Sequence, residues 1–220
     1  TEDKDWLNNW KKYFKPFRVT DNIIIKPTWE ELKDAKEEDI VIEIDPGTAF
    51  GTGSHETTKL SIMDLRNYLK KDENLLDVGC GSGILSIIAK KLGAKKVVGL
   101  DIDLNAVETA YWNSRVNKLF SNKIKFIHGN LLEDDKAELD SQIGLNSYDI
   151  VVANILADII IPLSEIIGKY LKPGGYFLSS GIIYSRSSQV EEAIKKNGFE
   201  IIEINTMGDW VSIVARKPVN

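Results

Sequence analysis

The pattern best suited to chemistry is a run of three glycines at alternate positions, DVGCGSG at Asp77 to Gly83, between a strand-like and a helix-like segment. Glycines let a backbone approach a ligand closely, and the helix that follows presents free N–H groups. A pyrophosphate-binding fingerprint would require another glycine at position 84, where the sequence has Ile84. We therefore expect Gly79 and Gly81 to make room for a bound ligand, with a simple strand-to-helix turn as the alternative.

A second chemical candidate ends the next strand-like run, GLDID at Gly99 to Asp103. It follows the glycines by about twenty residues, the separation at which a carboxylate can accept hydrogen bonds from both hydroxyls of a ribose. Asp101, at the strand tip, is our choice for that role. Asp103 has a structural alternative, because it and Asn105 can cap the following helix.

Composition excludes several other functions. The 220 residues include one cysteine, Cys80, and two histidines, His55 and His128, so an internal disulfide is impossible and structural zinc is not expected. A net charge of −5 argues against a surface dedicated to nucleic acid. The apolar runs are too short to cross a bilayer and the first residues do not resemble a secretory signal, so we expect a cytoplasmic protein that does not use a membrane.

The elements that must position these residues begin near residue 74, where β-rich runs alternate with amphipathic helical patterns. This alternation predicts an α/β fold in which helices cover both faces of a parallel sheet. The expected strands are 74–79, 95–101, 123–129, 148–154, 175–181, 199–206 and 209–217. The expected helices are 84–92, 105–118, 157–171 and 187–197, of which the third is stopped by Pro173-Gly174-Gly175.

The last two expected strands are separated only by Met207 and Gly208. A parallel crossover needs many more residues, so these strands must pair antiparallel as a hairpin. The sequence thus predicts a seven-stranded, mostly parallel sheet with a C-terminal antiparallel hairpin.

A small N-terminal extension precedes this sheet. Residues 3–14 form a pattern typical of a short aromatic helix, and 17–27 and 40–44 are expected strands. We divide the chain into a linker helix with a small β element, 1–45, and a main domain, 46–220.

The glycine loop, the ribose acid and the terminal hairpin together resemble the Rossmann-like class I S-adenosylmethionine-dependent methyltransferases. Longer segments narrow the resemblance to the PrmA family, and matching stretches run from Trp6 to Trp210. The matching segments are DPGTAFGTGSHETT (45–58), DVGCGSGILS (77–86), GLDID (99–103) and ANILA (153–157), with WxxxWKKYFKPFRV near the front. The first of these is the most specific.

The resemblance implies S-adenosyl-L-methionine as cofactor and a large-subunit ribosomal protein, L11, as the methylated partner, at lysine ε-amino or N-terminal α-amino groups. Members of the family carry a further N-terminal domain that recognises this protein. We expect the chain to begin after that domain, and therefore to bind the cofactor but methylate its substrate poorly. We also expect a monomer that requires no direct contact with nucleic acid.

The segment 46–54 has the composition of a loop with an aromatic tip, which favours a lid over the cofactor; a surface Ω-loop is the alternative. Ser54 is the expected N-cap of the next helix, with Thr57 and Thr58 in its first turn. The resemblance implies that Thr58 contacts the methionine end of the cofactor, with simple capping as the alternative.

Asn154 follows the fourth strand, at the edge where ligands lie in open α/β sheets. Its amide can both donate to and accept from an incoming amine, so we expect a catalytic and a cofactor-binding role, with helix capping as the alternative. Related enzymes that methylate adenine follow this position with two prolines and an aromatic residue, whereas this chain has Ile155, Leu156 and Ala157. That departure favours a protein amine over a nucleobase.

The remaining candidates have structural interpretations. We expect His55 to face solvent in the first turn of its helix, His128 to be structural and Cys80 to fill apolar space. Other functions remain open: a methyltransferase acting on another protein, RNA or a small molecule, a nicotinamide-dependent dehydrogenase, and an inactive binding module. Ile84 and the terminal hairpin oppose the dehydrogenase.

Overall fold

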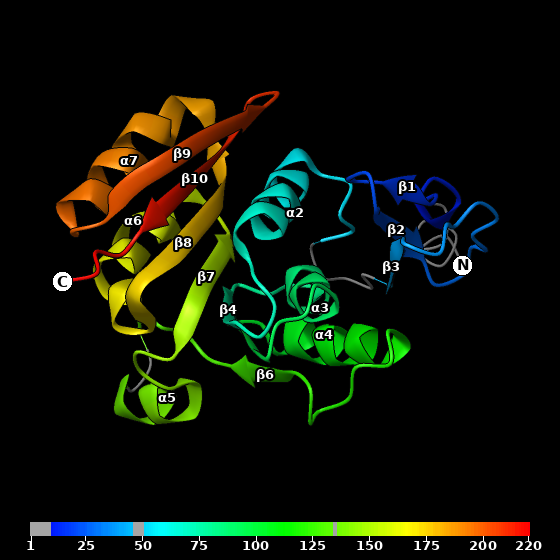
Figure 1. The fold of residues 1–220 in the computed structure, drawn as a ribbon, viewed down its shortest axis with the longest axis horizontal. Helices are drawn as coiled ribbons and strands as arrows, with labels where there is room; N and C mark the ends of the chain where they lie inside the picture. The colour runs from blue at the N-terminus through cyan, green and yellow to red at the C-terminus, as the bar shows by residue number, and fades with distance from the viewer. Residues whose placement is uncertain (1–9, 46–50, 134–135) are drawn as a thin grey trace, which may run out of the picture.

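The seven predicted strands are present as one sheet in the computed structural model, which describes residues 10–45, 51–133 and 136–220 (Figure 1). Their order across the sheet is β6-β5-β4-β7-β8-β10-β9, and β10 is antiparallel to both of its neighbours, β8 and β9. The bounds are β4 Asn74–Val78, β5 Lys96–Asp101, β6 Lys125–His128, β7 Tyr148–Asn154, β8 Leu171–Ile183, β9 Glu200–Met207 and β10 Trp210–Arg216. The predicted fold class is confirmed.

Helices cover both faces of this sheet, as the apolar central strands require. One face packs against α2 (Glu56–Tyr68), α3 (Ile84–Lys91) and α4 (Leu104–Val116). The other packs against α5 (Lys136–Ile143), α6 (Ala157–Ile166) and α7 (Ser187–Lys196). Because β4, β5 and β7 are parallel neighbours, the residues that follow them meet at one edge. That edge is where the candidate residues gather.

The N-terminal extension is a separate three-stranded sheet of β1 (Phe17–Arg18), β2 (Ile23–Pro27) and β3 (Ile40–Ile44). The single strand expected over 17–27 is wrong, because the chain turns back between β1 and β2 and the two pair antiparallel. The turn is closed locally, since the Thr20 hydroxyl accepts a hydrogen bond from the N–H of Ile23 at 3.1 Å.

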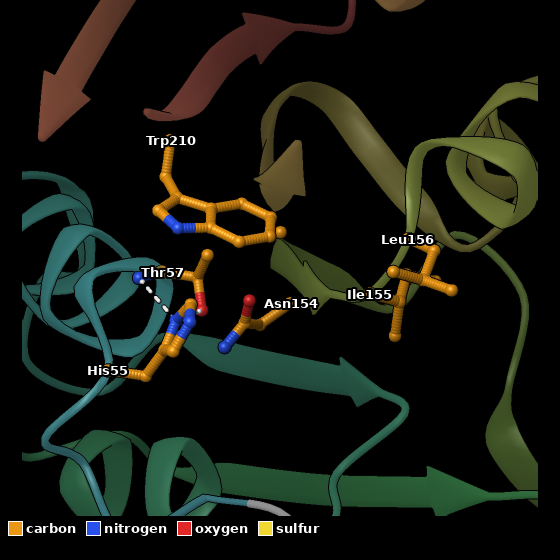
Figure 2. A pocket seen from close by; sticks show the side chains of 7 residues that line it. His55, Thr57, Asn154, Ile155, Leu156 and Trp210 are labelled. Carbon is orange, nitrogen blue, oxygen red and sulfur yellow. Dashed lines mark hydrogen bonds between the residues drawn. The ribbon is translucent and has the colours of Figure 1, made fainter. Parts of the chain in front are cut away.

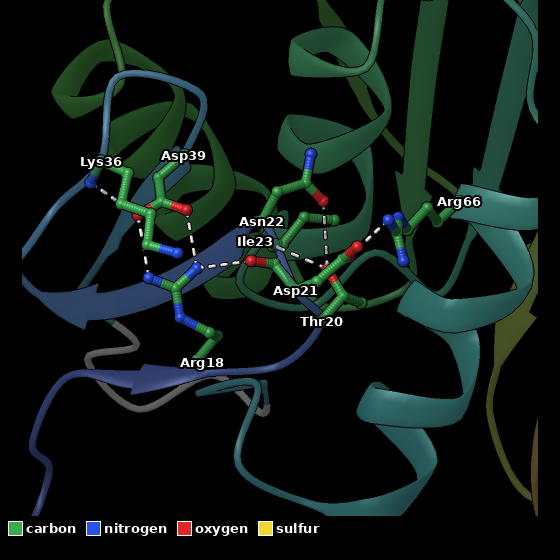
Figure 3. A network of polar contacts seen from close by, with 8 residues as sticks. All are labelled: Arg18, Thr20, Asp21, Asn22, Ile23, Lys36, Asp39 and Arg66. Carbon is green, nitrogen blue, oxygen red and sulfur yellow. Dashed lines mark hydrogen bonds and ion pairs between the residues drawn. The ribbon is translucent and has the colours of Figure 1, made fainter.

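Polar side chains fix this small sheet to the main body. The side-chain oxygen of Asn113, in α4, accepts a hydrogen bond from the backbone N–H of Asp45 at 2.9 Å. The side-chain oxygen of Asn117, directly after α4, accepts one from the backbone N–H of Glu43 at 3.0 Å. On the other side, Arg66 of α2 forms an ion pair with Asp21 in the β1–β2 turn (Figure 3). The extension therefore packs against the helices beside the site, while the division at residue 45 stays a prediction.

Figure 3 also shows a bidentate ion pair between Arg18 and Asp39, at 2.6 and 2.9 Å. Asp39 accepts a further hydrogen bond from the N–H of Lys36 at 2.8 Å. The arginine thus joins β1 to the turn that leads into β3, and this network gives the long connection between β2 and β3 a defined shape.

Several other elements differ from expectation. The helix expected over 157–171 ends at Ile166 and is followed by a short 3₁₀ turn, Ile167–Lys169. Pro173-Gly174-Gly175 lies inside β8 and does not stop that helix. The N–H of Gly174 donates to Lys217 O at 3.0 Å, so this part of the strand is bonded to the residues that follow β10. Helix α5 was not predicted, because few of its residues are apolar. Of the expected helix 3–14, residues 1–9 lie outside the described part, and Trp10–Lys12 forms a 3₁₀ turn.

Candidate active site

The glycine loop after β4 is partly exposed at Gly79 and Gly81. Gly79 has φ +75°, and a Cβ atom there would lie 2.6 Å from Cγ2 of Ile155. The N–H groups of Gly79 and Cys80 both donate to Leu100 O, at 2.7 and 2.9 Å. These bonds hold the loop against β5, so only glycine fits at position 79 and the loop presents backbone to any ligand above it.

Asp101, at the tip of β5, is bound directly to this loop. Its Oδ2 accepts from the N–H of Gly81 at 2.8 Å and its Oδ1 from the N–H of Asp103 at 2.9 Å. Asp103 is the N-cap of α4, accepting from the N–H of Asn105 at 2.9 Å, which confirms its capping alternative, whereas the ribose role of Asp101 stays a prediction. Each oxygen of Asp101 keeps acceptor capacity for a further donor, as a ribose would require.

Asp77, which begins the glycine motif, was not among the predicted site residues. It is buried, and its Oδ2 accepts from the Ser86 hydroxyl at 2.7 Å. Burial raises the pKa of Asp77 to about 7, against the hydrogen bond from Ser86, which favours the charged form. Its Oδ1 has no hydrogen-bond partner within the described residues. Buried polar atoms are normally hydrogen-bonded, so the unpartnered Oδ1 next to the glycine loop is what we expect if a polar ligand completes this site.

This carboxyl group should make stability depend on pH. The pKa of Asp77 is higher in the folded chain than the ordinary 3.8, so folding favours its protonated form. The associated stabilisation is complete below about pH 4 and is lost as the pH rises through about 7. We expect Asp77→Asn to gain free energy of unfolding relative to wild type progressively between these limits, measured by urea denaturation without ligand. Parallel pH profiles would contradict the assigned environment.

Beside the glycine loop lies a cavity of about 270 Å³ (Figure 2). It lies between the start of α2, the end of β7, and strands β8 and β10. Its mostly apolar wall is formed by His55, Thr57, Asn154, Ile155, Leu156, Gly181 and Trp210. The cavity thus brings together residues from positions 55 to 210, including the partly exposed Asn154.

Asn154 and Thr58 are in contact. The Nδ2 of Asn154 donates to the Oγ1 of Thr58 at 3.2 Å, and Thr58 is buried in the first turn of α2. The capping alternative for Asn154 is wrong, because the N-cap of α6 is Leu156 and no side chain caps that helix. The Ser180 hydroxyl donates to Thr57 O at 2.9 Å and so joins the start of α2 to β8. The contacts orient the Asn154 amide, whereas its role toward cofactor or amine stays a prediction.

His55 differs from its expected place. It, and not Ser54, is the N-cap of α2: its Nδ1 accepts from the N–H of Thr57 at 3.2 Å. Its ring is not turned wholly to solvent, because it meets Trp210 edge to face, with ring centroids 5.0 Å apart. No local signal links these two residues, since the antiparallel return of β10 brings Trp210 to the cavity.

The other candidates are largely as expected. Burial raises the pKa of the Cys80 thiol, which agrees with a packing role. His128 ends β6, with its Nε2 3.0 Å from Ile102 O. Of the expected lid, residues 46–50 lie outside the described part; the flanking Gly51 is held by a 2.6 Å hydrogen bond from the Ser82 hydroxyl to its carbonyl.

No group of three or more His, Cys, Asp or Glu side chains among the described residues is arranged to hold a metal ion. No helix in the described ranges is both long and apolar enough to span a membrane.

Comparison with known proteins adds a family match. The family described as "Ribosomal protein L11 methyltransferase (PrmA)" matches residues 1–218. A ribosomal protein L11 methyltransferase of Lachnoclostridium phytofermentans is 59% identical, over 99% of this chain and 69% of that protein. The crystal structure of a ribosomal protein L11 methylase from Lactobacillus delbrueckii subsp. bulgaricus superposes with a TM-score of 0.83 at 33% identity, covering 93% of this chain and 100% of the other.

A more distant structure shows the fold alone. The crystal structure of a SAM-dependent methyltransferase from Aquifex aeolicus has a TM-score of 0.57 at 16% identity, covering 71% of this chain and 88% of that one.

Proposed function

Because the chain belongs to the ribosomal protein L11 methyltransferase (PrmA) family, we propose that it transfers methyl groups from S-adenosylmethionine to amines of ribosomal protein L11. The acceptors we propose are lysine ε-amino groups, the N-terminal α-amino group, or both. The observation that carries the proposal is Asn154, which lines an apolar cavity next to the glycine loop and donates a hydrogen bond to the buried Thr58. We further propose that the chain acts in the cytoplasm, as a monomer and without direct contact with nucleic acid.

The residues present fit the cofactor. Gly79 and Gly81 have positive φ angles and are partly exposed, and Asp101 has acceptor capacity for ribose hydroxyls. Thr58, in the first turn of α2, lies where hydroxyl and N–H groups favour the carboxylate of an amino acid. When bound, S-adenosylmethionine supplies an electrophilic methyl group on a sulfonium.

Asn154 is proposed to position the acceptor amine. Its Nδ2 is bound to Thr58, and its Oδ1 accepts no hydrogen bond from the described residues, so that oxygen is available to an amine N–H. An amine held through its N–H has its lone pair directed by that bond. Positioning of this kind can account for much of the acceleration of a bimolecular transfer.

The acceptor must also lose a proton, since a free lysine has a pKa near ~10.4. The mostly apolar wall of the cavity favours the neutral amine, because burial disfavours the charged form. In the observed conformation Nδ1 of His55 already accepts from the N–H of Thr57. The proposed mechanism therefore uses desolvation and does not assign a side-chain base.

The cavity favours a protein amine over a nucleobase. Ile155 and Leu156 follow Asn154, and both line the wall, so the position next to the amide offers aliphatic groups and no aromatic platform for a base. Trp210 and His55 contact each other edge to face on another side of the cavity. An unbranched aliphatic amine suits this space.

The direct test is mass spectrometry of purified ribosomal protein L11 after incubation with the chain and S-adenosylmethionine. Because the chain is expected to methylate L11 poorly, we expect mass increments of one methyl group or more to accumulate slowly, located by peptide mapping at amino groups. Methylation of RNA or of a small amine, with L11 unchanged, would contradict the proposed substrate while leaving the cofactor assignment intact.

A further inference from the structure

Four large apolar side chains are exposed around the mouth of the cavity. Leu156 is 66% exposed, Ile159 44%, Ile183 43% and Tyr184 68%. Single exposed apolar residues are common, but a contiguous group at the entrance of a pocket marks a binding surface. We call these four residues the apolar rim.

The rim is one surface because its elements are bonded to each other. Ile183 at the end of β8 is the register partner of Trp210 on β10, and the N–H of Tyr184 donates to Asp209 O at 2.8 Å. Arg186, in the turn after β8, forms a 2.7 Å ion pair with Asp158 at the start of α6. The two segments that carry the rim therefore stand next to each other.

The rim is continuous with the cavity, since Leu156 belongs to both. Figure 2 shows Leu156 on the far side of Asn154 from His55. Within the first turn of α6, the N–H of Ile159 donates to Leu156 O at 2.9 Å, so the two apolar side chains are separated by one helical turn. A chain whose amine enters the cavity beside Leu156 can therefore lie along this surface.

Two carboxylates also lie next to residues that line the cavity. Glu56 is exposed, with its Oε2 3.9 Å from Nε2 of His55, and the exposed Asp209 directly precedes Trp210. These acids attract a cationic amine before it is desolvated and repel phosphate groups. A partner that matches both features carries an amine next to an apolar side chain.

We propose that the apolar rim binds an extended segment of the protein substrate and holds an apolar side chain within a few residues of the acceptor amine. This inference rests on the proposed function, because it takes a protein amine as the acceptor. It adds a substrate-recognition surface within the catalytic part of the chain. The rim contributes through burial of apolar area, which lowers KM and leaves the chemical step unchanged.

The test compares rim and control variants of the chain with ribosomal protein L11 as the probe. Ile159→Ser and Tyr184→Ser each remove one rim side chain that does not line the cavity. Ile202→Ser is the matched control, because Ile202 of β9 is 41% exposed and is not part of the rim. Methyl transfer gives kcat and KM, and calorimetry with S-adenosylhomocysteine gives cofactor affinity.

We expect each rim variant to raise KM for L11 by roughly tenfold, the loss of about half of a buried apolar side chain's transfer free energy. The expected kcat, cofactor affinity and melting temperature stay at wild-type values, as do all parameters of Ile202→Ser. If the rim variants are active and their KM for L11 is unchanged, the proposed role of the rim is contradicted and the proposed function is not. A wild-type chain that transfers no methyl group to L11 would overturn the proposed function, and the rim with it.

A second copy of the chain is the competing occupant of the rim. Sedimentation velocity distinguishes it: a wild-type dimer that Tyr184→Ser dissociates without a change in KM would make the rim a contact between copies and overturn the proposal. A wild-type chain that is monomeric at assay concentration, with the KM increase above, supports a substrate segment as the occupant.

Discussion

Replacing Asn154 by alanine is expected to lower kcat for methyl transfer by roughly 30-fold to 1,000-fold, the range for loss of a preorganised hydrogen bond worth about 2 to 4 kcal/mol. The reason is positional. The Oδ1 of Asn154 is at the wall of the cavity and Nδ2 is bound to Thr58, so the amide is oriented before an amine arrives. An interaction realised mainly in the transition state affects kcat more than affinity. Single-turnover transfer measures the chemical step, and equilibrium titration measures cofactor binding.

Thr58→Ser is a suitable companion variant, because serine retains a hydroxyl that can accept from Nδ2 of Asn154. We expect it to keep most of the wild-type rate. Unchanged turnover in Asn154→Ala would remove the proposed positioning role. A loss confined to cofactor affinity would make Asn154 a cofactor ligand only.

Replacing Asp101 by alanine is expected to weaken S-adenosylhomocysteine binding by about 1.5 to 3 kcal/mol, which corresponds to roughly 10-fold to 150-fold in Kd. The ribose hydroxyls would lose a charged acceptor. The N–H of Gly81 would lose its partner as well, since it donates to Oδ2 at 2.8 Å, so the glycine loop would also be less well held. Both effects weaken the part of the site that is proposed to hold the cofactor, namely Asp101 and the glycine loop.

Two further variants separate these effects. Asp101→Asn keeps one acceptor oxygen and the side-chain size, and we expect a smaller loss than for alanine. Asp103→Ala removes the N-cap of α4, which should lower stability by about 1 kcal/mol and leave Kd nearly unchanged. Wild-type affinity in Asp101→Ala, with a loss in Asp103→Ala, would transfer the ribose role to Asp103.

The sheet and half of the site could be predicted because their signals are local. The central strands are short apolar runs. Gly79 directly follows β4, and Asp101 and Asn154 are the last residues of β5 and β7, so all three lie at the same edge. The two-residue connection at Met207 and Gly208 fixed the antiparallel hairpin by chain length alone. Such features depend on neighbours in the sequence.

The cavity wall could not be predicted, because it depends on distant contacts. His55 and Trp210 meet only after β10 returns beside β8. Asp77 was read only as part of a glycine motif, since burial and an unpartnered oxygen are not visible in a sequence. Pro173 and its two glycines are typical of a helix end, yet pairing with the chain terminus placed them inside a strand.

The cofactor assignment underlies every other step, and titration of S-adenosylhomocysteine into the wild-type chain by isothermal calorimetry tests it most directly. We expect saturable heat with one site per chain, a higher melting temperature at saturating ligand, and no comparable response to NADH. Absence of both heat and thermal shift at millimolar S-adenosylhomocysteine would contradict the assignment.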